Sequence, residues 1–107
     1  MEFGIESKGM DKIMKSIDKL AIGLDPQELA QWARKIEAMA RQLSKDSPNY
    51  IALKDTDGKE LELSVKNRKS ANCLVKAIET NIPSMSLFVQ GVFSKLASEL
   101  REAKFNP

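Results

Sequence analysis

The sequence contains no histidine and only one cysteine, Cys73. Histidine is the commonest general base and the commonest metal ligand in proteins, and a single thiol cannot close a disulfide within the chain. These two absences predict a protein that is not an enzyme, that holds no metal or cofactor, and that does not depend on an oxidising compartment for its stability.

Long apolar runs are absent as well. No segment has the roughly 18 consecutive uncharged apolar residues that a membrane-spanning helix requires. Glu2, Glu6 and Lys8 are spread over residues 1–10, which is not the pattern of a basic start followed by an apolar signal sequence. The sequence therefore predicts a cytoplasmic protein with no membrane segment.

The composition is that of an ordinary globular protein. The chain has 107 residues, of which 42% are hydrophobic and 30% charged, and chains with this balance fold around a packed core. No segment repeats another, and the breaks at 44–49 and 81–84 are too short to link separate domains. We expect a single α+β domain over residues 1–107, in which about four helices pack with one β-hairpin.

Two patterns near the N-terminus predict a strand and a helix. Phe3, Ile5 and Ser7 alternate with small or charged residues, and this two-residue period predicts a short strand. The apolar residues that follow recur every three or four positions and predict a first helix that ends at Gly23. They are Met10, Ile13, Met14, Ile17, Leu20 and Ala21.

The clearest local pattern surrounds Pro26 and predicts the start of a second helix. Asp25 can cap the helix, Pro26 takes the first helical position, Glu28 completes a capping box, and Leu24 packs onto Leu29. The predicted helix runs to the segment 44–48. Its expected core-facing residues are Leu29, Trp32, Ala33, Ile36, Met39, Ala40 and Leu43.

A β-hairpin is predicted in the middle of the chain. Two segments of alternating polarity, 50–54 and 59–66, flank Asp55 to Gly58, where Asp57-Gly58 suits the turn. The side chains expected to point inward are Ile51, Leu53, Leu61, Leu63 and Val65.

Two further helices are predicted after the hairpin. Asn67 or Ser70 can cap the first of them, and Asn81-Ile82-Pro83 ends it. Its inward residues are Ala71, Leu74, Val75 and Ile78. The last helix is expected to bury Met85, Phe88, Val89, Val92, Leu96 and Leu100. Gly91 is expected to admit a close neighbouring helix.

The net charge of +2 is concentrated in the middle of the chain. Lys66, Arg68, Lys69 and Lys76, which we call the basic junction, have no acidic residue between them and lie where the hairpin enters the next helix. Free backbone N–H groups and the positive end of the helix dipole meet there, so the basic junction predicts contact with phosphate or with nucleic-acid backbone. The alternative is a solvated junction whose lysines only maintain solubility.

Other chemical signals have plainer interpretations. Asp55 to Gly58 is similar to the middle of a calcium loop, but Leu53 and Ser64 stand where the first and last ligands are required. Cys73 has no histidine to act as its base and is expected to be half-buried and structural. Trp32 is expected to lie in the core rather than to stack on a ligand.

The succession of helix, glycine turn, helix and later hairpin resembles a winged-helix DNA-binding domain. The turn glycine and the apolar positions around it are matched by Ile22, Gly23, Leu24, Leu29 and Trp32. The resemblance implies a face that enters a DNA groove, made of Gln27, Gln31, Arg34 and Lys35, and phosphate contacts from the hairpin by Lys54 and Lys59. Lys19, where a small residue is usual, and the acidic Asp25 depart from the pattern.

A second resemblance lies at the N-terminus. Residues Ile5 to Ile13 resemble the strand, glycine and helix opening of phage tail-component proteins of the head-to-tail junction, which implies a role in assembly. We assign the chain to neither family on these residues.

Two hypotheses of function remain. The leading one is a small non-enzymatic module that binds nucleic-acid backbone through the basic junction and the hairpin lysines. The alternative is a protein-interaction or self-assembly module that uses the last helix. Leu87, Phe93 and Phe105 motivate it, because they flank or lie beyond the predicted apolar stripe and are expected to form an exposed patch.

Overall fold

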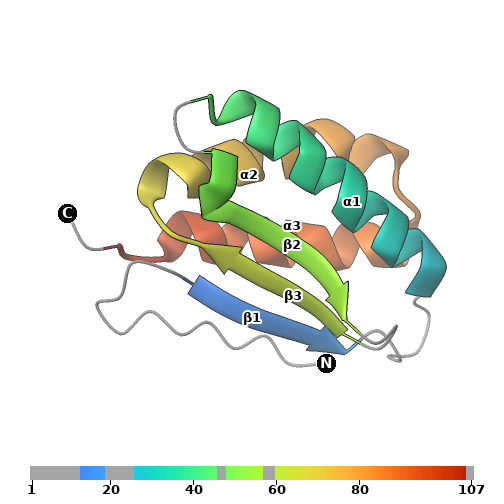
Figure 1. Ribbon diagram of the computed structural model, residues 1–107. Helices are drawn as coiled ribbons and strands as arrows, with labels where there is room; N and C mark the ends of the chain where they lie inside the picture. The colour runs from blue at the N-terminus through green and yellow to red at the C-terminus, as the bar shows by residue number, and fades with distance from the viewer. Residues whose placement is uncertain (1–12, 19–25, 46–47, 57–59, 106–107) are drawn as a thin grey trace.

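A three-stranded antiparallel sheet with helices packed on one face forms the described part of the chain (Figure 1). The computed structural model describes residues 13–18, 26–45, 48–56 and 60–105. The strands are β1 (Ile13–Asp18), β2 (Ile51–Thr56) and β3 (Glu60–Val65), and the helices are α1 (Pro26–Leu43), α2 (Arg68–Asn81) and α3 (Leu87–Glu102). Short 3-10 helices cover Pro48–Tyr50 and Ile82–Ser84. The predicted α+β class is confirmed.

The predicted hairpin is present as β2 and β3. Leu53 lies opposite Leu63 and Ile51 lies opposite Val65 in an antiparallel pair, and all four side chains are buried. Glu62, one position out of phase, is exposed. The alternation of polarity therefore identified the core face of this hairpin correctly, because neighbouring side chains of a strand point to opposite faces of the sheet.

Two predicted helices after position 25 begin where the capping residues indicated. α1 starts at Pro26, and α2 starts directly after Asn67, whose side-chain oxygen accepts the backbone N–H of Ser70 at 2.7 Å. The predicted inner face of α2 is buried throughout. Asn81 ends this helix, as predicted, and the chain turns through a 3-10 helix into α3.

The helix predicted at residues 10–21 is wrong for residues 13–18, which form β1. This strand pairs with β3, with Ile13 opposite Val65 and Ile17 opposite Leu61. Ile13 and Ile17 are four residues apart, a spacing that fits one helical turn but is also a multiple of the two-residue strand period. The rest of the predicted helix, and the strand predicted at residues 3–7, lie outside the described residues.

The winged-helix arrangement and the count of four helices are not confirmed, because a strand rather than a helix precedes α1 in the described residues. β1 occupies an edge of the sheet in the order β1-β3-β2, and α1 packs along the opposite edge (Figure 1). The segment that resembles phage tail-component proteins lies outside the described residues except for Ile13, which begins β1.

α1 closes the outer edge of β2 with two side chains one helical turn apart. A carboxylate oxygen of Glu37 accepts the backbone N–H of Leu53 at 2.7 Å, and the Nε of Arg41 donates to the carbonyl oxygen of Ile51 at 3.1 Å. An unpaired strand edge is a template for pairing with another chain. In this protein the side chains of Glu37 and Arg41 make two of the hydrogen bonds that a fourth strand would otherwise make with β2.

The core residues predicted for the last helix are buried except Phe88, and Phe93 extends the buried face: Met85, Val89, Val92, Leu96 and Leu100 are buried as predicted. Phe93, expected outside the apolar stripe, is 0% exposed, whereas Phe88, expected in the core, is 58% exposed. The stripe that is buried contains Val89, Phe93, Leu96 and Leu100, spaced by four, three and four residues as one helix face requires. Gly91 is exposed and a Cβ there would meet nothing within 4 Å, so it admits no close helix neighbour.

The three helices and the inner face of the sheet share one core. Its largest fully buried side chains are Phe93, Leu29, Ile36, Ile51, Leu63, Leu74, Ile78 and Leu96. No helix in the described ranges combines the length and the apolar character needed to cross a membrane.

Candidate functional site

The basic junction lies where β3 enters α2. The backbone N–H of Lys66 donates to the carbonyl oxygen of Tyr50 at 3.1 Å, which extends the hairpin by one residue. Asn67 then leaves the strand with φ −151° and ψ 169° and caps α2 with its side chain. Because the cap follows the strand directly, Lys66, Arg68 and Lys69 are held within one turn of the helix start.

Three of the four cations of the basic junction are exposed. Lys66 is exposed with its Nζ 5.8 Å from the centroid of the Tyr50 ring, and Lys69 and Lys76 are exposed on α2. Lys69 and Lys76 are seven residues apart, so they lie on the same outward stripe of the helix, with the exposed Asn72 between them. These lysines are exposed from the end of β3 to the third turn of α2.

Arg68, the fourth cation, points into the protein. Its guanidinium donates to the carbonyl oxygen of Leu100 at 2.8 Å and to that of Ala103, at the C-terminal end of α3, and its Cζ lies 4.9 Å from the centroid of the Phe105 ring. A longer contact of 3.5 Å joins it to Asn72. Arg68 is therefore not the exposed phosphate ligand that the sequence predicted, because its guanidinium is bound within the protein.

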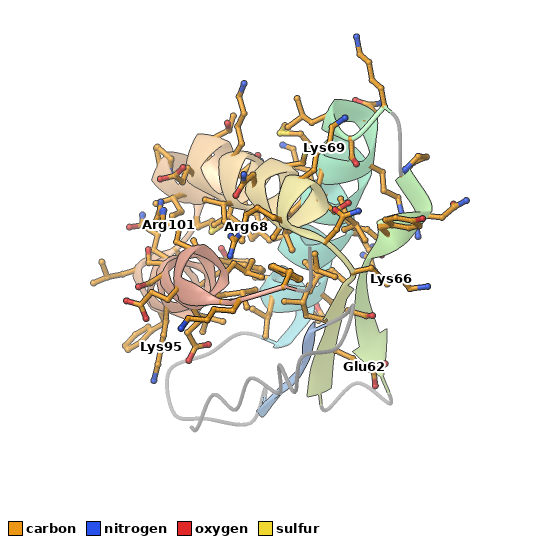
Figure 2. The ribbon with its side chains drawn as sticks, turned by 90° about the vertical axis from the view of Figure 1, so that its left-hand side faces the viewer. Glu62, Lys66, Arg68, Lys69, Lys95 and Arg101 are labelled. Atoms are coloured by element: carbon orange, nitrogen blue, oxygen red, sulfur yellow. The ribbon has the colours of Figure 1, made fainter. Side chains whose placement is uncertain are left out.

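The contacts of Arg68 are electrostatically favourable. The end of α3 is the negative end of its helix dipole, and the carbonyl groups at a helix end lack helical partners. Both properties favour a guanidinium at this position. Figure 2 shows Arg68 on the side of α2 that faces α3, whereas Lys69 lies toward α1 and Lys66 toward the strands. The cations of the basic junction therefore diverge instead of converging on one point.

The residues predicted to enter a DNA groove lie on α1. Gln27, Gln31, Arg34 and Lys35 are all exposed, and Lys35 has its Nζ 5.0 Å from the centroid of the Trp32 ring. They occupy the side of α1 turned away from its buried residues, so they form a surface of their own on a different helix from the basic junction. The side chains of Lys54 and Lys59, predicted to touch phosphates, lie outside the described residues.

The most exposed large apolar side chains begin α3. Leu87 is 79% exposed and the adjacent Phe88 is 58% exposed, and we call this pair the apolar pair. Of the three residues predicted to form an exposed patch, Leu87 is exposed, Phe93 is buried, and Phe105 is half-buried against the core. The exposure of Phe88 was not predicted, because Met85, Phe88 and Val92 are spaced by three and four residues, as the members of one helix face are.

Glu28 joins the start of α1 to the start of α3. Its Oε2 accepts the backbone N–H of Ser86 at 3.0 Å and the indole N–H of Trp32 at 3.2 Å. The bond from the Ser86 backbone is the main cause that lowers the pKa of Glu28 below its usual value, since a donor stabilises the charged carboxylate. Trp32 itself is half-buried and packs against the core, as predicted.

No feature of the described residues resembles a metal or thiol site. Cys73 is half-buried beside the core, as expected for a structural cysteine. Within the described ranges no cluster of three or more cysteine, aspartate and glutamate side chains is placed to hold a metal ion.

Comparison with protein-family models, curated proteins and solved structures returned no match. A function for this protein is therefore inferred from the exposed side chains of the chain itself.

Proposed function

We propose that the protein is a small non-enzymatic module that binds the phosphate backbone of nucleic acid through Lys66, Lys69 and Lys76. The observation that carries the proposal is the exposure of all three lysines between the end of β3 and the third turn of α2, in a stretch that contains no acidic residue from Leu63 to Ile78. Lysine side chains act as flexible point charges, and backbone contacts of this kind give binding that is independent of nucleotide sequence.

The nearest acidic residue along α2 supports this assignment. Glu79 forms an ion pair with Arg101 of α3, so its charge is partly offset. No acidic residue lies between Lys69 and Lys76 along these two turns of the helix, which favours a polyanion that contacts the lysines one after another.

Salt dependence provides the test. Labelled duplex DNA, single-stranded DNA and RNA are titrated with the protein at several salt concentrations, and binding is followed by fluorescence anisotropy. If the three lysines neutralise three duplex phosphates, the plot of log affinity against log salt has a slope of about −2.7. Absence of binding to all three probes even at low salt would refute the proposed function.

A charge-matched pair of variants locates the site. Reversal of Lys69 and Lys76 to glutamate is expected to abolish binding, whereas reversal of Arg34 and Lys35 on α1 changes the net charge equally and is expected to leave most of it. Equal losses would mean that net charge, not the surface of α2, controls the affinity. A greater loss from the α1 variant would instead move the interface to α1.

The apolar pair favours a second candidate function, protein interaction or self-assembly. Two adjacent large apolar side chains at 79% and 58% exposure contribute nothing to the core, and exposed apolar surface is a common mark of an interface. Sedimentation equilibrium at tens of micromolar tests self-assembly, with a double change of Leu87 and Phe88 to serine as the comparison. A monomeric mass for both proteins would remove self-assembly as a function of the pair.

A further inference from the structure

The contact between Arg68 and the end of the chain is unusual for a cation in a basic surface. Arg68 is the only arginine of the basic junction, and its guanidinium is engaged by the carbonyl oxygens of Leu100 and Ala103 and by the ring of Phe105. Its neighbours Lys66 and Lys69 are exposed. Arg68 is the side chain of the basic junction that can form a bidentate pair with phosphate, and the protein itself binds its guanidinium.

The groups that hold Arg68 are weaker partners than phosphate. Leu100 and Ala103 offer neutral carbonyl oxygens, and hydrogen bonds to an ionised acceptor are about twice as strong as those to neutral acceptors. A guanidinium can also form a parallel, bidentate pair with phosphate that two separate carbonyls do not reproduce. A phosphodiester at the start of α2 could therefore compete for Arg68 on favourable terms.

Two of the three residues that hold Arg68, Ala103 and Phe105, lie beyond the last turn of α3, whereas Leu100 belongs to that turn. Ala103 is the C-cap, with φ −66° and ψ 147°, and its backbone N–H makes the closing bond to the carbonyl oxygen of Glu99. Lys104 and Phe105 follow the cap and are not part of the helix. Displacement of Phe105 therefore requires no helical hydrogen bond of α3 to break, although it removes a half-buried ring from the core.

We propose that residues 103–105 form an autoinhibitory contact, which we call the latch. The latch holds Arg68 away from the exposed lysines of α2 and lowers the affinity of the protein for nucleic-acid backbone. Loss of the Phe105 ring removes one of the three contacts of the guanidinium, so that a phosphodiester strand bound by Lys66 and Lys69 can draw it away from the carbonyl oxygens of Leu100 and Ala103. This inference rests on the proposed function, and it adds Arg68 as a latent fourth contact.

The test compares the affinity of the unaltered protein for duplex DNA with that of Phe105→Ala and Phe105→Leu. Loss of the cation–ring contact is expected to increase the affinity of the alanine variant about fivefold and to make the salt slope more negative by about 0.9, as one additional phosphate contact requires. Phe105→Leu retains apolar packing but has no ring, so it should change in the same direction. Circular dichroism and urea unfolding establish that each variant is folded.

Two controls separate the latch from other effects. In an Arg68→Ala background, Phe105→Ala should leave the affinity unchanged, since the residue that it releases is absent. Phe88→Ala removes an exposed ring from the other end of α3 and should not alter the affinity.

The outcomes distinguish the latch from the proposed function. Salt-dependent binding that Lys69 and Lys76 control, with no increase on loss of the Phe105 ring, overturns the latch and retains the proposed function. An increase that persists without Arg68 also overturns it. If neither the unaltered protein nor any folded variant binds at low salt, both the proposed function and the latch are wrong.

Discussion

The backbone N–H groups at the starts of α2 and α3 find hydrogen-bond partners in different ways. Each helix begins after an extended residue, Asn67 or Ser86, and leaves backbone N–H groups without helical partners. Asn67 satisfies one of them with its own side chain, whereas the side chain of Ser86 makes no capping hydrogen bond. The start of α3 depends instead on another helix, because the backbone N–H of Ser86 is bound by Glu28 of α1.

The exposed surfaces at these two helix starts differ as much as their caps. α2 begins among lysines, and α3 begins with the apolar pair Leu87 and Phe88. A capped, cationic helix start suits a polyanion, whereas an apolar one suits a protein surface. The comparison teaches that a small domain of this kind can present two exposed surfaces of opposite chemistry, since neither set of side chains belongs to the buried core.

The largest expected effect separates the two phenylalanines of α3. Phe93 is fully buried, so Phe93→Ala should destabilise the protein by about 3–5 kcal/mol through lost burial and a residual cavity. Phe88→Ala should change stability by less than about 0.5 kcal/mol, as is usual for exposed positions. Urea unfolding followed by circular dichroism measures both. A loss of similar size at Phe88 would mean that the apolar pair supports the fold and is not surplus surface.

The next effect concerns Arg68, which links the start of α2 to the end of α3. Arg68→Ala removes two hydrogen bonds from a charged donor and should cost about 1.5–3 kcal/mol, because the carbonyl groups of Leu100 and Ala103 lose their partner. Lys69→Ala, one position along, should cost less than about 0.5 kcal/mol. Equal values for the two variants in urea unfolding would show that Arg68 does not hold α3 in solution.

A smaller effect tests the caps directly. Asn67→Ala removes the 2.7 Å bond to the Ser70 N–H and should cost about 1 kcal/mol. Ser86→Ala removes no side-chain capping bond, although it removes the hydroxyl that also bonds the Glu28 carboxylate, and it should cost less than about 0.5 kcal/mol, since the backbone N–H of residue 86 still reaches Glu28. Thermal or urea unfolding of both variants gives the comparison, and a greater loss at Ser86 would reverse our interpretation of the two helix starts.

The features that the sequence predicted correctly are those with a local cause. Pro26 and Asn67 mark helix starts because capping is decided within about four residues. The alternation of Leu61, Leu63 and Val65 predicts a strand for the same reason, since each strand shows its own two-residue period. The hairpin, α1 and α2 could all be read from such short windows.

The predictions that were wrong concern residues whose partners lie far along the chain or whose spacing fits more than one arrangement. Ile13 and Ile17 fit both a helix and a strand, and the edge of β3 that pairs with them lies far along the chain. Arg68 is bound by carbonyl oxygens 32 and 35 residues away, and every residue carries such an acceptor, so no pattern marks the partner. Phe88 and Phe93 were assigned to the wrong environments, although the other predicted core residues of the last helix are buried, because both positions fit a spacing of three and four residues.

The smallest expected effect depends on pH and concerns the bond that replaces a cap at α3. The folded-state pKa of Glu28 is lowered, so its charged form is stabilised by the Ser86 N–H. A group with a lowered pKa contributes its full stability above the unfolded pKa, near 4.5, and loses that contribution as the pH falls through the folded value.

Glu28→Gln retains an oxygen acceptor but carries no charge. It should cost less than about 1 kcal/mol at neutral pH, since the carboxylate is close to solvent. The difference between the two proteins should shrink steadily in urea unfolding as the pH falls from about 6 to about 3. A difference that stays constant over that range would mean that the charge of Glu28 does not hold the start of α3, and that the contrast between the two helix starts lies in Asn67 alone.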